Sequence, residues 1–178
     1  AKGHAFRTIL DKNYNAQGRK KGEEPFDFEA HTGVYEWNAA LEQFERTGND
    51  DIIRILFPTE GSTSNNAELQ LLAYEEIEIY DAEWEEYMYE PTLLQASLFV
   101  DDAEVASLDL NIEWDEEGFP ITADLVAEVI PFKATLSFDV SASDKNSLSA
   151  SLLRGQETIF STSVEVLYSG SDKSEEDL

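Results

Sequence analysis

A strict two-residue alternation of apolar and polar side chains, which begins near residue 67, constrains the fold more than any other feature of this sequence. In residues 132–141, FKATLSFDVS, every second side chain is apolar. Residues 105–114 and 121–129 repeat the pattern, and only Val105 and Val126 interrupt it. A period of two places all apolar side chains on one face of a β-strand. The sequence therefore predicts several long strands, each with one apolar face.

The joints between these runs are short and polar or contain proline, as at Asp101-Asp102, Pro131 and residues 154–156. Joints of this length connect antiparallel neighbours, because a parallel crossover needs about a dozen residues. Upstream, residues 53–57 and 69–73 also alternate, and residues 34–46 favour a hairpin over a helix. Apolar residues at i, i+3 and i+4 indicate a short helix in residues 4–14. The fold class expected is all-β, a strongly curved antiparallel meander sheet or barrel of about 8–10 strands with a short N-terminal helix.

The apolar face of such a meander must be covered, and little helix is available to cover it. We therefore expect the sheet to curl into a barrel or half-barrel. A narrow barrel is filled by its own side chains, whereas a wide one encloses an apolar cavity, and the sequence leaves both open. The side chains expected to line the interior are Leu108, Leu110, Ala123, Leu125, Leu136 and Phe138.

Length and charge limit the organisation and the partners. The 178 residues fit a single β domain over residues 1–168, with a basic segment at 1–22 and an acidic tail at 169–178. The chain has 12 basic and 38 acidic residues, a formal net charge of −26, and residues 55–132 contain no base. Nucleic-acid binding relies on Lys and Arg that neutralise phosphates, so we expect no nucleic-acid partner. No run approaches the ~18–20 apolar residues of a membrane-spanning helix.

Several chemistries lack the residues they need. The chain has no cysteine and only two histidines, His4 and His31. Neither the glycine-rich phosphate-binding motifs nor GxSxG or HExxH occurs. Paired acids are too numerous to single out a catalytic pair, so we expect no enzyme and no cofactor. Asp101 and Asp102 are weak calcium candidates, since adjacent acids in short joints are usually turn formers.

Residues 74–90, YEEIEIYDAEWEEYMYE, combine eight acids with five aromatic residues and no base. Aromatic rings beside carboxylates can contact a sugar or a protein surface. The same residues can instead pack a loop against the rim of the sheet. The candidate contact residues are Tyr80, Trp84, Tyr87 and Tyr89.

The segments FDFEAHTGVYEWN, DIIRILFPTEGSTSNNAELQLLAY, PTLLQASLFVDDAEVASLDL, EWDEEGFP and LLRGQETIF occur in this order over residues 26–168. In this the chain resembles uncharacterised lipid-anchored, lipoprotein-type envelope proteins of gut Gram-negative bacteria. The resemblance implies a secreted or lipid-anchored protein of the cell envelope, with an acylated cysteine upstream of Ala1, and it carries no assigned activity. The leading hypothesis is a non-enzymatic binding or scaffold module with a protein or glycan partner. The alternative is a carrier that holds an apolar, lipid-like ligand inside the sheet.

Overall fold

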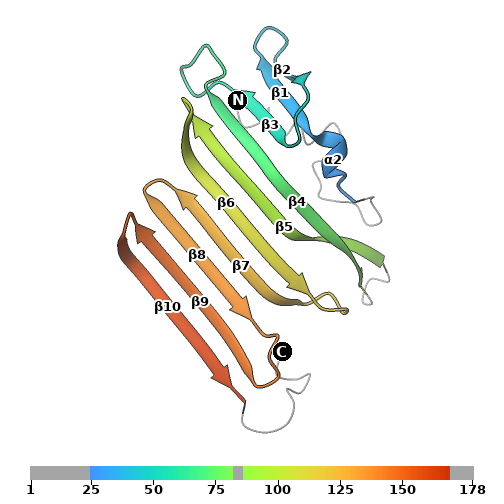
Figure 1. The fold of residues 1–178 in the computed structure, drawn as a ribbon, viewed down its shortest axis with the longest axis vertical. Helices are drawn as coiled ribbons and strands as arrows, with labels where there is room; N and C mark the ends of the chain where they lie inside the picture. The colour runs from blue at the N-terminus through green and yellow to red at the C-terminus, as the bar shows by residue number, and fades with distance from the viewer. Residues whose placement is uncertain (1–24, 82–85, 169–178) are drawn as a thin grey trace.

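Ten strands lie side by side in one sheet in the computed structural model, which describes residues 25–81 and 86–168 (Figure 1). A four-residue helix, α2 (Phe28–His31), precedes the sheet, and the Asp27 carboxylate accepts a hydrogen bond from the Ala30 N–H at its start. The strands are β1 (Gly33–Asn38), β2 (Gln43–Gly48), β3 (Ile53–Phe57), β4 (Ala67–Asp81), β5 (Glu86–Val100), β6 (Ala103–Trp114), β7 (Pro120–Val129), β8 (Phe132–Asp139), β9 (Lys145–Arg154) and β10 (Glu157–Leu167).

The strand order is β10-β9-β8-β7-β6-β5-β4-β3-β1-β2. From β3 to β10 each strand pairs antiparallel with the next strand in the sequence, which confirms the predicted meander. The β1–β2 hairpin confirms the hairpin predicted for residues 34–46. That hairpin joins the sheet through a parallel pairing of β1 with β3, so β2 becomes the edge strand. The sheet is thus mixed, with one parallel pair that the sequence did not predict.

Cross-strand register aligns the apolar residues into rows that cross the sheet. One row joins Leu94, Leu110, Leu125 and Leu136 on four successive strands. A second row runs through Ile112, Ala123, Phe138, Leu148 and Val164. Residues in register share a face. The sheet therefore has one apolar face, as the alternation predicted, and this face is called the apolar face below.

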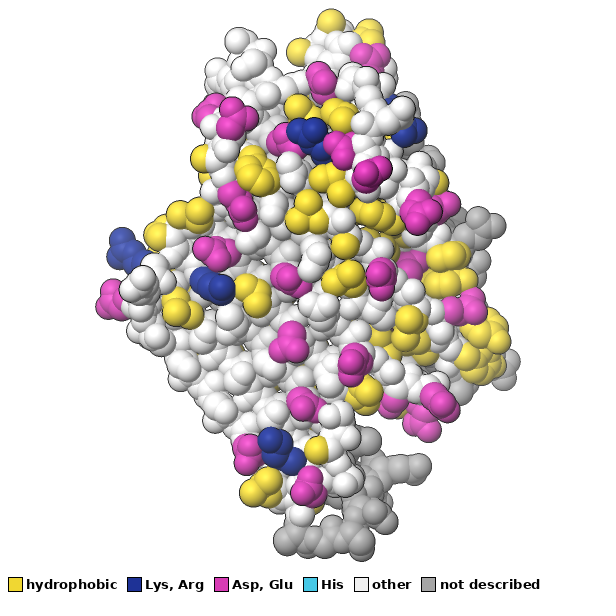
Figure 2. Space-filling view, viewed as in Figure 1, with side chains coloured by type: hydrophobic (Ala, Val, Ile, Leu, Met, Phe, Trp, Pro, Cys, Tyr) yellow, Lys and Arg dark blue, Asp and Glu magenta, His cyan; other side chains and the backbone are white. Residues whose placement is uncertain are grey.

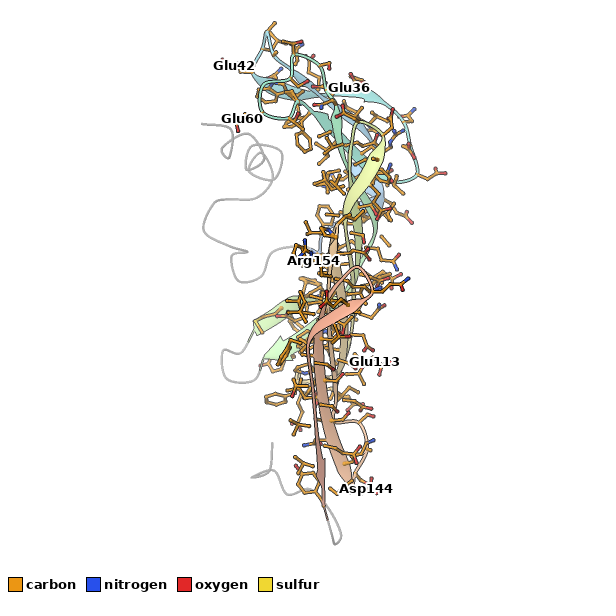
Figure 3. The ribbon with its side chains drawn as sticks, turned by 90° about the vertical axis from the view of Figure 1, so that its left-hand side faces the viewer. Glu36, Glu42, Glu60, Glu113, Asp144 and Arg154 are labelled. Carbon is orange, nitrogen blue, oxygen red and sulfur yellow. The ribbon has the colours of Figure 1, made fainter. Side chains whose placement is uncertain are left out.

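The opposite, polar face carries acidic side chains spread over the whole sheet. Figure 2 shows this face, with many Asp and Glu side chains and few Lys or Arg. In the edge-on view, Glu36 and Glu113 point to the right of the sheet, which is the polar side (Figure 3). Among the described residues, the ion pairs on or beside it join Arg54 with both Glu68 and Asp50, Lys133 with Glu128, and Lys145 with Glu165.

The sheet does not close into a barrel. β10 and β2 lie at opposite ends of the strand order and do not pair with each other. Figure 3 shows most of the sheet as a single layer seen edge-on. A barrel was expected because the sheet would then cover its own apolar face. Within residues 25–81 and 86–168 the sheet leaves this face uncovered. The helix predicted for residues 4–14 and the acidic tail lie outside the described residues.

Deep burial is confined to one part of the sheet. Ile53, Ile55 and Ala67, in β3 and at the start of β4, are 2–8% exposed, and Ile79 near the end of β4 is 5% exposed. Every residue of β10 is exposed. The one helix of the described chain is too short to cross a membrane. The tightest packing therefore lies at the β3–β4 side, and the β10 side is open.

Candidate functional site

The far ends of β4 and β5 form a hairpin end that leaves the plane of the sheet. Two irregularities in the β4–β5 register, at Leu71/Ala73 and Glu75/Glu76, precede this end. Such bulges bend a strand pair and increase its twist. In Figure 3 the end, drawn in green, projects to the left of the sheet, away from Glu113. Strand β4 thus continues to Asp81 and β5 begins at Glu86, both within the segment that the sequence predicted as a loop at the rim.

Tyr80 and Tyr87 face each other across this hairpin end. Their ring centroids are 5.2 Å apart with planes at 60°, and the two residues are 47% and 56% exposed. Two residues further along, the Tyr89 hydroxyl donates a 2.6 Å hydrogen bond to Glu78 Oε1. Register places all four residues on one face of the hairpin. We call Glu78, Tyr80, Tyr87 and Tyr89 the hairpin-end surface.

The other face of the hairpin end is held by packing. Ile79 is buried against the β6–β7 turn, where a Cβ at Gly118 would lie 2.6 Å from Ile79 Cγ2. The Trp114 indole N–H donates to the Pro91 carbonyl oxygen at 3.0 Å, which ties β5 to the end of β6. The hairpin end is therefore supported on one face while Tyr80 and Tyr87 are exposed on the other. Of the four predicted contact residues, three are brought together, and Trp84 lies outside the described residues.

The six side chains predicted to line an interior lie together on the apolar face. Leu110, Leu125 and Leu136 are direct neighbours in one row, and Ala123 and Phe138 are neighbours in the next. Leu108 lies one row further along β6 and pairs with Ala127. The prediction of their common face is confirmed. They surround no lumen in the described sheet, because the sheet is open.

Asp101 and Asp102 form the two-residue turn between β5 and β6. Both have positive φ, 51° and 62°, which a two-residue hairpin turn of type I′ requires. Asp101 accepts a hydrogen bond from the Asn66 side-chain amide at 3.1 Å, and its N–H donates to the Asn66 carbonyl oxygen at 2.8 Å. No group of three His, Cys, Asp or Glu residues within residues 25–81 and 86–168 is placed to hold a metal ion. The two aspartates are thus turn formers tied to the neighbouring loop.

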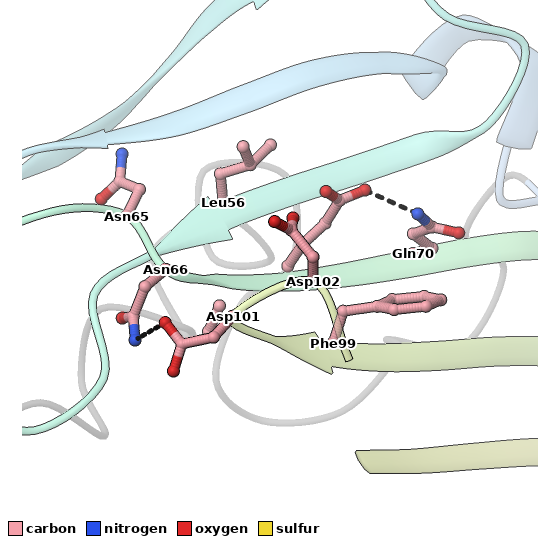
Figure 4. Close-up of a pocket in the computed structure, with 9 residues that line it drawn as sticks. Leu56, Asn65, Asn66, Gln70, Phe99, Asp101 and Asp102 are labelled. Atoms are coloured by element: carbon pink, nitrogen blue, oxygen red, sulfur yellow. Dashed lines mark hydrogen bonds between the residues drawn. The ribbon is translucent and has the colours of Figure 1, made fainter. Parts of the chain in front are cut away.

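A polar hollow of about 340 Å³ opens beside this turn (Figure 4). Leu56, Ala67 and Phe99 form its apolar part, and its other walls are side-chain carboxylates and amides. A second hollow of about 660 Å³ lies between the β1–β2 hairpin and the loop after β3, and it shares Asn65 with the first. Neither hollow was predicted from the sequence, because both form where the loop at residues 58–66 meets other elements, and no motif encodes that arrangement.

Glu68, one wall of the first hollow, is engaged by Arg54. Arg54 Nε donates to Glu68 Oε1 at 2.6 Å and Nη2 donates to Oε2 at 2.9 Å. This two-point contact lowers the pKa of Glu68, and the Gln70 amide, which donates at 2.7 Å, acts in the same direction. The same contact raises the pKa of Arg54. Glu68 is thus a charged, fully engaged carboxylate, which suits a structural ion pair better than a proton donor.

Comparisons with protein-family models, with curated proteins and with solved structures find no match to this chain.

Proposed function

We propose that the protein is a non-enzymatic binding module of the cell envelope, and that the hairpin-end surface contacts a neutral glycan. The observation that carries the proposal is the exposed Tyr80–Tyr87 pair on a supported, projecting hairpin end. The envelope location rests on the sequence resemblance alone.

The chemistry of the surface supports a sugar ligand. Tyrosine rings offer apolar faces to the C–H side of a sugar, and their hydroxyls form hydrogen bonds at its edge. The exposed Glu78 carboxylate, beside Tyr89, accepts hydrogen bonds from sugar hydroxyls. A formal net charge of −26 repels anionic polymers, so a neutral polysaccharide fits better than a charged one.

The test compares two double variants with the wild-type protein by affinity electrophoresis in gels that contain a neutral polysaccharide, β-glucan, mannan or amylose. We expect at least one polysaccharide to retard the wild-type protein. Tyr80→Ala/Tyr87→Ala removes both rings and should weaken binding at least tenfold, which corresponds to about 1.4 kcal/mol. Tyr80→Phe/Tyr87→Phe keeps the rings and should lose less.

The matched control is Leu41→Ala, which removes an apolar side chain that is 57% exposed at the β1–β2 turn, and which should bind as the wild type does. All variants should keep their melting temperature within about 2 °C, because the altered side chains are exposed. Wild-type protein that none of the polysaccharides retards would overturn the glycan assignment. Equal retardation of the alanine variant would remove the hairpin-end surface from the binding site.

The carrier of an apolar ligand stays a prediction. It needs an enclosed apolar volume of roughly 300 Å³ or more. The two hollows described above have many polar lining residues and lie away from the Leu110–Leu125–Leu136 row. An apolar ligand would therefore have to bind on the open apolar face. A lipid-sized adduct in the native mass spectrum of the wild-type protein would identify such a ligand.

A further inference from the structure

The apolar face is uncovered over β7–β10 among the described residues. The main contacts between the described elements join neighbouring strands, and α2 packs against β4. On this side of the sheet, seven large apolar side chains from β7 to β10 are 40–62% exposed. They are Val129, Phe132, Leu136, Leu148, Phe160, Val164 and Val166. Contiguous exposed apolar area of this kind marks a contact surface.

The described chain begins on this same face. The Phe26 N–H donates to Glu76 Oε1 at 2.6 Å, and the Phe26 ring lies edge-on to Tyr74 with centroids 5.4 Å apart. Tyr74 pairs with Leu94, the first member of the Leu110–Leu125–Leu136 row. The His31 ring stacks on the Phe26 ring, with centroids 5.1 Å apart. The described part of the chain therefore begins at the apolar face and not at the polar one.

We propose that residues 1–24 of this chain pack across the apolar face and form the second layer of the domain. Their sequence carries the apolar residues Phe6, Ile9 and Leu10 at the spacing of one helix face. Their length is sufficient. From β4 to β10 the sheet spans six strand spacings, about 29 Å at ~4.8 Å each, and 24 residues reach much further than this even when half of them are helical.

Charge favours this occupant. Residues 1–22 hold six bases and one acid, whereas the rest of the chain holds six bases and 37 acids. A basic segment that lies on the sheet therefore reduces the repulsion among its carboxylates. A second copy would instead bring together two molecules that each carry a formal charge of −26. Electrostatic repulsion therefore disfavours a second copy on the apolar face, and electrostatic attraction favours the basic segment of the same chain.

Photo-crosslinking tests the proposal directly in the full chain. Because the chain has no cysteine, Ile9→Cys gives a single attachment point for a benzophenone maleimide. After irradiation, peptide mapping of the monomer band should find the label on β7–β10, in residues 132–139 or 145–154. The control is Thr8→Cys, which lies on the opposite side of the predicted helix and should crosslink to these strands at least fivefold less. Crosslinks confined to a dimer band, or absent from β7–β10, would overturn the proposal.

A second measurement uses the dye ANS, which binds exposed apolar surface. The variant Phe6→Asp/Ile9→Asp/Leu10→Asp should bind ANS at least threefold more strongly than the wild type. His4→Asp/Thr8→Asp/Asn15→Asp adds the same charge at two positions on the opposite helix side and one just after the helix, and it should bind ANS as the wild type does. Equal ANS binding by the wild type and the first variant would overturn the proposal. So would a lipid-sized adduct, released by organic solvent, in the native mass spectrum of the wild type, because the face would then hold a ligand.

Discussion

At the scale of single residues, Arg54 and Glu68 show how this acidic protein places its few bases. Arg54 contacts Glu68 at two points, and it also lies 3.4 Å from Asp50. One guanidinium thus serves two carboxylates on a part of the sheet where bases are scarce. Such two-point contacts are stronger than ordinary surface ion pairs.

Glu68→Gln should lower the free energy of unfolding by about 1 kcal/mol at pH 7. The Glu68 side chain is only 19% exposed, which strengthens the ion pair, whereas solvent around the more exposed Arg54 side chain weakens it. Because folding lowers the pKa of Glu68, the carboxylate stabilises the fold above its ordinary titration range, and this contribution is lost as the pH falls through the folded-state pKa. The difference from the wild type in urea unfolding should therefore be smaller at a strongly acidic pH than at pH 7. Glu113→Gln, at an exposed carboxylate on the same face, should show a small effect at both pH values. A loss that is equal at both pH values would contradict this.

Gly118 and Gly155 give a matched pair that separates crowding from backbone strain. Both have positive φ, 87° and 60°. An added Cβ meets Ile79 at 2.6 Å at Gly118 and nothing within 4 Å at Gly155. Gly155→Ala should cost about 1 kcal/mol of backbone strain, and Gly118→Ala about 2–4 kcal/mol, because it also displaces a buried side chain. Urea unfolding measures both, and equal losses would show that Ile79 moves aside freely.

At the scale of elements, the turns set where each strand ends. The β5–β6 turn places both Asp101 and Asp102 at positive φ, a conformation that glycine and asparagine adopt at lower cost. The hydrogen bonds of Asp101 to Asn66 compensate for part of this cost. Asp102 is thus the position of this turn at which a substitution should most readily stabilise the fold.

Asp102→Gly should raise the free energy of unfolding by about 0.5–1 kcal/mol, because it relieves the backbone strain of a non-glycine residue at positive φ and keeps the Asp101–Asn66 contact. Asp101→Gly should gain less or lose stability, because it deletes that contact. Thermal melts of the two variants, compared with the wild type, measure the difference. The reverse ranking would contradict the assigned roles of the two aspartates.

The sequence predicts the elements well where a strand has one apolar face. Residues 105–114, 121–129 and 132–141 correspond closely to β6, β7 and β8, and residues 34–46 form the expected hairpin. The parallel β1–β3 pairing was not predicted, because strand order depends on contacts between segments that local alternation does not encode. At the site, the aromatic stretch pointed to Tyr80 and Tyr87. The bulges that turn their hairpin end out of the sheet have no sequence signature.

At the scale of the whole molecule, a broad sheet spreads its charge over a large surface. The twenty acids of residues 55–132 have no base within that segment. The described ion pairs involve only a few of the chain's carboxylates. Mutual repulsion among the others therefore opposes folding throughout the sheet.

Added salt should stabilise the fold at neutral pH, because it screens this repulsion within a Debye length of about 10 Å at 0.1 M. The melting temperature should rise by several degrees between 10 mM and 500 mM NaCl at pH 7. The same salt step at about pH 4, where many carboxylates are protonated, should have a smaller effect. A melting temperature that is flat across the salt series at pH 7 would contradict the screening argument.

The order of the strands also determines how the chain can assemble during synthesis. From β4 onward, every strand pairs with the one made just before it, across connections of two to nine residues. Short loops close within about 10–100 ns, and local pairings fold faster than distant ones. A chain that emerges from the ribosome can therefore add its strands one at a time, in the order of translation. β1 and β2 must wait for β3, and β10, the last strand to arrive, completes the sheet.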